Sequence, residues 1–121
     1  MRTIKFRVWD KDENKMFSLG DTISDEKVAY YLGGNDLEPQ YNSIVLMQFT
    51  GLLDKHEKEI YESDIVTLKY QGDSGKTAMV VEWDNENFGW YFVRGKNPKY
   101  SLAISSLKEG TEIEIVSNIY E

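Results

Sequence analysis

The chain contains no cysteine, only two prolines and a single histidine. Without cysteine it can form no disulfide, hold no metal through thiolates and use no thiolate nucleophile. The first 15 residues contain no long apolar run, so we expect neither a signal peptide nor a membrane-spanning helix. These absences fit a protein of a reducing cytoplasm.

Positive charge is also scarce. The chain has 14 Lys and Arg against 21 Asp and Glu, a formal net charge of −7, and both halves share the acid excess. Phosphate backbones are normally met by clustered Lys and Arg, so this composition argues against nucleic-acid binding. It favours simple solubility, or a partner protein with a basic surface.

Apolar and aromatic side chains, in contrast, are plentiful. Of the 121 residues, 40% are hydrophobic and 13% are aromatic. This composition is typical of a folded globular protein, and the length suits one domain with a modest core. Because we find no internal repeat, low-complexity tract or linker, we predict a single domain over residues 1–121.

Apolar and polar side chains alternate in many segments, with the period of a half-buried strand. The clearest case places Ile4, Phe6 and Val8 on one face and Lys5 and Arg7 on the other. The other expected strands are residues 44–49, 64–70, 77–83, 88–93 and 112–119. Turn-forming segments, among them 71–76 and 84–87, join these strands. The sequence therefore predicts a mainly β protein, a small barrel or sandwich.

Residues 24–34, SDEKVAYYLGG, are ambiguous. Ser24 suits the N-cap of a helix, acidic residues follow it, and Gly33-Gly34 suits a helix end. Apolar side chains also alternate between residues 28 and 32, which would suit a strand. We expect at most one short helix, at this place.

The stretch MQFTGLLDKHEKEIYESDIV, residues 47–66, resembles a pattern of the YopX family of phage and prophage proteins. That pattern is close to M-Q-[FY]-T-G-L-x-D-K-x-G-K-E-I-Y-E-G-D-I-V. Residues 4–16 are similar to the family's opening, and SNIYE at residues 117–121 resembles its closing G-N-I-Y-E. Residues 17–43 and 67–112 carry little recognisable signal.

Three residues depart from the pattern: Glu57, Ser63 and Ser117 stand where the family has glycine. Glycine in such a turn often marks a positive φ, where another residue costs about 1 kcal/mol. We therefore expect these turns to be built somewhat differently in this chain.

The resemblance implies a mostly β architecture with a small SH3-like barrel. We place the barrel in residues 60–121, with N-terminal strands and a variable insert in residues 1–59. It also implies a phage or prophage protein in the cytoplasm of a bacterial host. The family has no established activity, so the resemblance assigns no catalytic residue and no cofactor.

The same stretch gathers several oxygen-bearing side chains, which could form a paired-carboxylate or hard-metal site. A second interpretation is a turn in which Asp and Thr side chains bond to backbone amides. We favour the second because no known carboxylate-ligand spacing is present. In it, Asp64 fixes the entry to a strand, and Ile60 and Tyr61 fill the barrel end from one helical turn. The residues predicted to be structural are Thr50, Gly51, Asp54, Ile60, Tyr61, Glu62 and Asp64.

His56, the only histidine, lies between Lys55 and Glu57 in a charged loop. A histidine-dependent hydrolase needs a nucleophile and an orienting acid nearby, and no nucleophile signature such as G-x-S-x-G is present. We therefore predict that His56 is exposed and not catalytic.

Residues 88–101, FGWYFVRGKNPKYS, combine aromatic side chains with the densest cations of the chain. Such a combination can stack bases and neutralise phosphates, or grip a peptide. The alternative is that Phe88, Trp90 and Phe92 form core while the cations solubilise a turn. The candidate binding surface is Trp90, Tyr91, Arg94, Lys96, Lys99 and Tyr100.

Together these observations predict a non-catalytic accessory protein that binds a host or phage protein, with no cofactor and no metal. A nucleic-acid binder that uses the basic and aromatic patch is the first alternative. An enzyme that uses the carboxylates of residues 59–64 is the second. Self-association is a further possibility, because exposed strand edges can pair.

Overall fold

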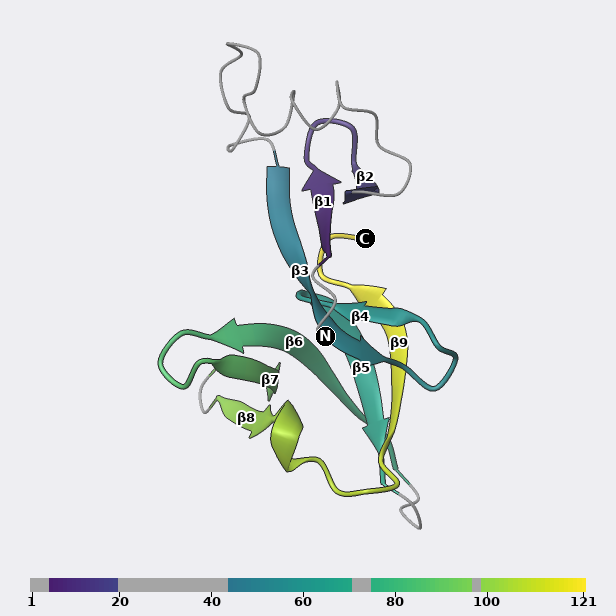
Figure 1. The fold of residues 1–121 in the computed structure, drawn as a ribbon, viewed down its shortest axis with the longest axis vertical. Coiled ribbons are helices and arrows are strands. Elements are labelled where there is room, and N and C mark those ends of the chain that lie inside the picture. The colour runs from purple at the N-terminus through teal and green to yellow at the C-terminus, as the bar shows by residue number, and fades with distance from the viewer. Residues whose placement is uncertain (1–4, 20–43, 71–74, 97–98) are drawn as a thin grey trace. The chain divides into compact units, whose positions relative to one another are not determined.

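The structure is a computed structural model that describes residues 5–19, 44–70, 75–96 and 99–121 (Figure 1). The described elements are nine strands and one short 3-10 helix, η1. Their bounds are β1 Phe6–Asp10, β2 Lys15–Leu19, β3 Ile44–Leu53, β4 Glu59–Tyr61, β5 Asp64–Lys69, β6 Thr77–Asp84, β7 Gly89–Arg94, β8 Tyr100–Ala103, η1 Ile104–Ser106 and β9 Glu112–Asn118. The predicted mainly β fold class is confirmed.

The sequence led to two expectations about helices: one short helix in residues 24–34 and no membrane-spanning helix. The ambiguous segment 24–34 lies outside the described residues. Within the described ranges, no helix has the length and apolar character needed to cross a bilayer.

The chain divides into two compact units, Met1–Phe49 and Thr50–Glu121. The boundary falls inside β3, so the first residues of this strand belong to one unit and the last to the other. The expectation that residues 1–121 act as one domain stays a prediction. The units are described separately below.

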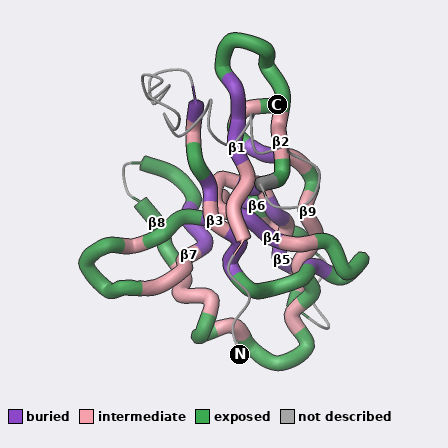
Figure 2. The backbone as a smooth tube through the Cα atoms, turned by 45° about the horizontal axis from the view of Figure 1, so that its top comes forward, coloured by how far each residue is buried: buried purple, intermediate pink, exposed green. Residues whose placement is uncertain are grey.

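The first unit is built on the β1–β2 hairpin, whose strands pair antiparallel; β1 also pairs with the first residues of β3. Val8 is fully buried and packs with Ile44 and Phe17. The carboxylate of Asp10 accepts a hydrogen bond from the backbone N–H of Asp12 and so helps to close the turn. That turn is exposed, while the neighbouring part of β1 is buried (Figure 2).

The second unit contains a five-stranded antiparallel sheet in the order β8-β7-β6-β5-β9. The sheet curls strongly, as half of a barrel would (Figure 1). Its strands lie between residues 64 and 118, within the range where the small barrel was predicted. The expected strands 64–70, 77–83, 88–93 and 112–119 correspond to β5, β6, β7 and β9.

Alternation along these strands directs one set of apolar side chains into a single core. The buried members are Ile60, Val66, Leu68, Met79, Val81 and Phe92. Partly buried side chains surround them: Trp90, Leu102, Ile104, Leu107, Ile113 and Ile115.

Two local predictions are wrong. Ile60 and Tyr61 are buried as expected, but they lie in strand β4 and not in a helical turn. Phe88 is 80% exposed and does not share the inner face with Trp90 and Phe92. Its φ of 53° places it in the turn between β6 and β7, where the chain reverses.

The three positions where the family pattern has glycine differ in backbone conformation. Glu57 and Ser63 have φ of 65° and 73°, in the left-handed region that favours glycine. Ser117 is not among the described residues with positive φ; it lies in β9, beside a register shift in the pairing with β5. The expectation of differently built turns is therefore wrong for Glu57 and Ser63. Both residues adopt the left-handed conformation that suits glycine, which is strained for a residue with a side chain.

We predict that Glu57→Gly and Ser63→Gly each raise the free energy of unfolding by up to about 1 kcal/mol, because glycine removes the left-handed strain. Urea denaturation of each variant measures the change. Ser117→Gly is the matched control, and we expect it to lower stability, because glycine in a strand costs conformational entropy. Equal stabilisation by all three substitutions would contradict this account of the turns.

Candidate functional site

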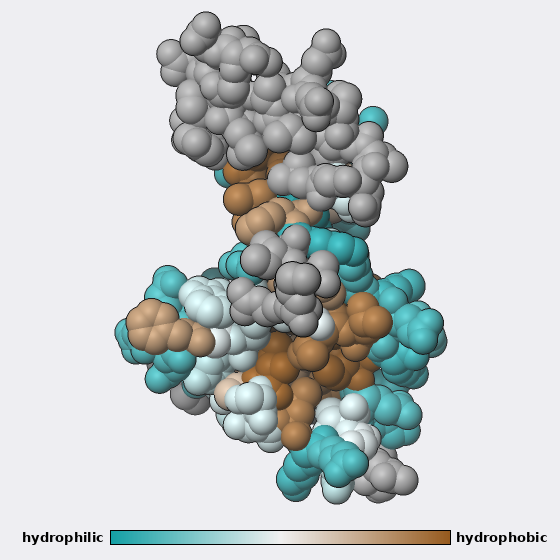
Figure 3. Space-filling view, in the orientation of Figure 1, coloured by the Kyte–Doolittle hydropathy of each residue, from teal (hydrophilic) through white to brown (hydrophobic). Residues whose placement is uncertain are grey.

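The curled sheet of the second unit leaves a hollow of about 560 Å³ on the side that carries the core. Its floor is apolar and consists of Leu68 from β5, Met79 from β6 and Leu102 from β8. Figure 3 shows apolar side chains gathered on this face, bordered by hydrophilic ones. The remaining lining residues are Tyr70, Thr77, Arg94, Tyr100, Ser106, Leu107, Lys108 and Thr111. We call this hollow the barrel pocket.

The floor follows from the same alternation that builds the core. Leu68 continues the inner face of β5 from Val66, and Met79 begins the inner face of β6 that Val81 continues. Leu102 lies opposite the buried Phe92 in the register of β7 and β8. The pocket is therefore the place where the apolar core of the half barrel reaches solvent.

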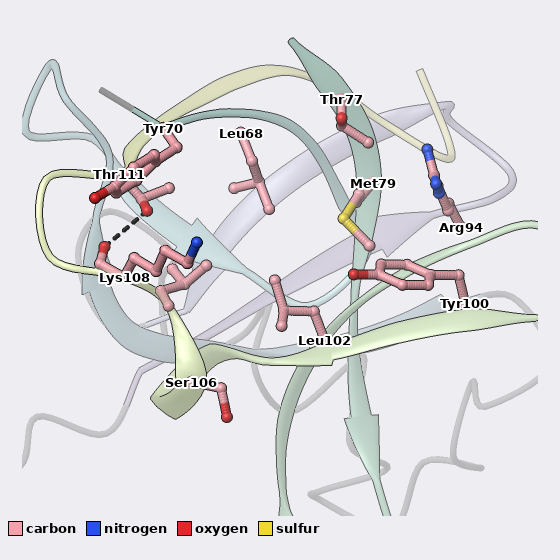
Figure 4. A pocket seen from close by; sticks show the side chains of 11 residues that line it. Leu68, Tyr70, Thr77, Met79, Arg94, Tyr100, Leu102, Ser106, Lys108 and Thr111 are labelled. Carbon is pink, nitrogen blue, oxygen red and sulfur yellow. Dashed lines mark hydrogen bonds between the residues drawn. The ribbon is translucent and has the colours of Figure 1, made fainter. Parts of the chain in front are cut away.

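Two cations lie at the rim of the barrel pocket, each over an aromatic ring. The guanidinium carbon of Arg94 is 5.0 Å from the ring centroid of Tyr100, and the Lys108 ammonium is 5.1 Å from that of Tyr70. Cation–π contacts at exposed sites contribute about 0.5–1 kcal/mol each and favour this placement of both side chains. In Figure 4 the two pairs lie on opposite sides of the apolar floor.

The charge of the pocket differs from that of the chain. None of the described residues that line it is acidic, whereas the whole chain has a net charge of −7. Arg94 and Lys108 form no ion pair with a carboxylate in the described ranges. The barrel pocket thus combines an apolar floor with a polar rim that carries two positive charges, and it suits an anionic and partly apolar ligand.

The predicted binding surface is split by the fold. Of its six residues, Arg94 and Tyr100 lie at the rim of the barrel pocket. Trp90 packs against the core and makes an edge-to-face contact with Trp83, with ring centroids 5.1 Å apart. Trp90 is therefore part of the scaffold.

The other three residues of the predicted surface lie elsewhere. Tyr91 and Lys99 line a second hollow that also includes Glu82, and the Lys99 ammonium is 3.5 Å from the Glu82 carboxylate. Lys96 is exposed and lies outside the barrel pocket, in a third hollow that Arg94 and Lys99 also line.

Sequence reasoning missed the second cation–aromatic pair. Tyr70 follows the last residue of β5 and lines the pocket beside Leu68, and Lys108 lies over its ring. Nothing in the local pattern of residues 107–111 indicates that η1 brings this segment back to the end of β5.

Asp54 is the main polar anchor of the stretch 47–66. It is only 6% exposed, and its Oδ1 accepts hydrogen bonds from the backbone N–H groups of His56 and Lys58 at 2.8 and 2.9 Å. Its Oδ2 accepts a third, 3.1 Å long, from the N–H of Ile115 in β9. Burial by itself raises the pKa of Asp54, but these backbone bonds outweigh it and hold the pKa below the ordinary value.

The other polar residues of this stretch also serve the backbone. The Thr50 hydroxyl donates to the Ile60 carbonyl at 2.8 Å, and Gly51 follows with a φ of +90°. Asp64 is 2% exposed, and its Oδ2 accepts a 2.8 Å hydrogen bond from the backbone N–H of Tyr61. Glu62, between them, is half-buried.

His56 lies on the surface, with its Nε2 3.1 Å from the Glu114 carboxylate and more than half of its side chain exposed. The hydrogen bond with His56 is the largest cause that lowers the pKa of Glu114, followed by the charges of Lys55 and Lys76. Within the described ranges, no three acidic or histidine side chains are grouped so that they could hold a metal ion.

We predict that Asp54→Asn lowers the free energy of unfolding by about 2 kcal/mol at neutral pH, because an ionised acceptor of buried backbone hydrogen bonds is lost. The folded-state pKa of Asp54 lies below its ordinary value of 3.8, so its stabilisation is present above pH 3.8 and is lost as the pH falls through the folded-state pKa. Urea denaturation at a series of pH values measures both effects.

The control for this test is Glu109→Gln, which removes an exposed carboxylate from a turn. We expect it to leave stability nearly unchanged. If Asp54→Asn behaves like this control, or weakens the protein equally above and below the carboxyl range, Asp54 is not an ionised anchor.

Comparisons with known proteins agree with the fold. No curated protein matches the sequence. Among solved structures, protein yopX from Bacillus subtilis is similar, with a TM-score of 0.60 and 20% identity over 99% of this chain and 94% of that one. Protein EF1440 from Enterococcus faecalis is similar as well, with a TM-score of 0.58 and 20% identity over 100% of this chain and 96% of that one.

At 20% sequence identity, the similarity to these two structures supports the fold alone. The family follows from the sequence, because the model of the family described as YopX protein matches residues 5–121. The chain therefore belongs to the YopX protein family.

Proposed function

We propose that this chain is a non-catalytic binding module whose ligand is another protein. The observation that supports this most directly is the barrel pocket, which offers apolar surface and two positive charges at one place. Apolar hollows with a few convergent polar groups are the usual form of a recognition site.

The polar contacts within residues 47–66 argue against an enzyme that uses the carboxylates of residues 59–64. Of the carboxylates of residues 59–64, Asp64 is almost fully buried and accepts a backbone hydrogen bond, so it is not placed to abstract a substrate proton, and Glu59 lies 3.4 Å from the Tyr61 hydroxyl. No histidine or carboxylate is found among the described residues that line the barrel pocket.

The positions of the cations speak against the nucleic-acid alternative. Lys99 lies beside Glu82, so part of its charge is already compensated. Arg94, Lys96 and Lys99 share one hollow, but Glu82 lies in it as well, and Lys108 lies on the opposite side of the barrel pocket from Arg94. Non-specific binding of single strands normally uses a positively charged groove that follows the backbone.

The setting is part of the same proposal. The family resemblance supports a phage or prophage origin and the cytoplasm of a bacterial host as the place of action. The acidic excess of the chain would also suit a basic surface elsewhere on the partner. Pairing of exposed strand edges between two copies is the competing mode of association.

The test is capture of partners from a host lysate with the tagged full chain, with and without nuclease, followed by mass spectrometry. The tag alone serves as control. We expect a specific protein that is still captured after nuclease treatment. Capture that disappears with nuclease, or no specific capture at all, would contradict the proposed function.

A further inference from the structure

Three features of the barrel pocket lie in one line. Arg94 and Tyr100 lie at one end, Leu102 follows two residues along β8, and Lys108 with Tyr70 lies at the other end (Figure 4). A positive charge, an apolar floor and a second positive charge therefore succeed one another along the direction of β8.

We propose that the barrel pocket binds an extended segment of a partner protein in which acidic side chains flank an apolar one. This inference rests on the proposed function and specifies its ligand. The apolar side chain lies on the floor formed by Leu68, Met79 and Leu102, and the flanking carboxylates face Arg94 and Lys108.

The apolar part of the ligand follows from the floor. Leu68 and Met79 are only 9% and 3% exposed, so most of the apolar surface left open at the floor belongs to the partly buried Leu102. An apolar side chain placed there leaves water, and the burial of its own surface stabilises the complex.

The acidic part follows from the rim. Arg94 and Lys108 are exposed, have no carboxylate partner in the described part of the chain and are kept in place by their tyrosine rings. Cations whose side chains already favour one placement lose less side-chain entropy when they meet a carboxylate. Because the rest of the chain is acidic, these two charges also distinguish this face from its surroundings.

The extended form follows from the position of β8 at the end of the sheet. One edge of β8 has no neighbouring strand among the described elements. A segment that pairs with this edge directs every second side chain to the face of Tyr100 and Leu102, toward the pocket. The spacing that fits is acidic, apolar and acidic at every second position.

A single-stranded nucleic acid also alternates anionic and apolar groups, but this pocket suits it less well. Its floor is aliphatic, whereas bases are normally stacked on aromatic rings. Tyr70 and Tyr100 each have a cation over the ring, so one face of each ring is already in use.

The experiment measures the affinity of the full chain for a fluorescein-labelled nonapeptide with the central pattern Glu-Ser-Leu-Ser-Glu. Binding is followed by anisotropy, and backbone amide resonances locate the site. We expect saturable binding with shifts in residues 100–108. Replacing the peptide leucine with serine should weaken binding about tenfold or more, and replacing its glutamates with lysines should abolish it.

The variant Arg94→Gln/Lys108→Gln should bind this peptide about threefold to tenfold more weakly, since two exposed charge contacts are lost. Both side chains are exposed, so the variant should fold normally. Lys96→Gln is the matched control, because it removes an exposed cation that does not line the pocket. We expect it to change the affinity little.

Several results would overturn the inference: no peptide binding, equal weakening by Lys96→Gln, or tighter binding of an octathymidylate probe. Concentration-dependent shifts of residues 100–108 without peptide would overturn it as well, because a second copy would then fill the site. If a lysate protein is captured equally by wild type and by Arg94→Gln/Lys108→Gln, the pocket assignment fails while the proposed binding function stands.

Discussion

The second unit depends on one buried carboxylate. Asp54 gathers the turn of residues 54–58 around itself and also accepts a hydrogen bond from Ile115 in β9. The N–H of Lys55 donates to the Ile113 carbonyl beside it, so the turn supplies hydrogen-bond partners to the outer edge of β9. A terminal strand whose edge is occupied in this way is less open to pairing with another chain. The most recognisable stretch of the sequence thus acts by fixing the last strand of the sheet.

The protein contains both many carboxylates and a pocket with two cations, and the two groups of side chains have different partners. Asp54 and Asp64 of the family stretch accept hydrogen bonds from backbone amides, and Glu114 on β9 pairs with His56, Lys55 and Lys76 at the surface. Arg94 and Lys108 are instead held by tyrosine rings, which position a cation without neutralising its charge. The carboxylates and these two cations therefore have different contacts and do not neutralise one another.

Most of the fold could be predicted from the sequence, because alternation of apolar residues specifies the inner face of each long strand. Prediction from this alternation failed for short or irregular segments. Three-residue β4 has no period to detect, and Phe88 fits the alternation of the core although it lies in the turn between β6 and β7. The structural role of Asp54 and Asp64 could be anticipated from turn chemistry, but the bond from Asp54 to Ile115 joins residues 61 positions apart.

The candidate site could be predicted only in part, for a similar reason. Arg94 and Tyr100 are close in sequence and were selected together, whereas Lys108 and Tyr70 meet only through the return of the chain after η1. The amino-acid composition gave no sign of this site either, because the net charge of −7 does not reveal that Arg94 and Lys108 line one hollow.

The central claim is that the chain binds a protein through the barrel pocket while residues 50–64 serve as scaffold. Hydrogen–deuterium exchange of the full chain, with and without a captured partner, tests this claim most directly. The account predicts slower exchange in residues 99–111 and around Leu68 and Tyr70, with residues 50–64 unchanged. Protection centred on residues 54–64, with the pocket unaffected, would contradict it.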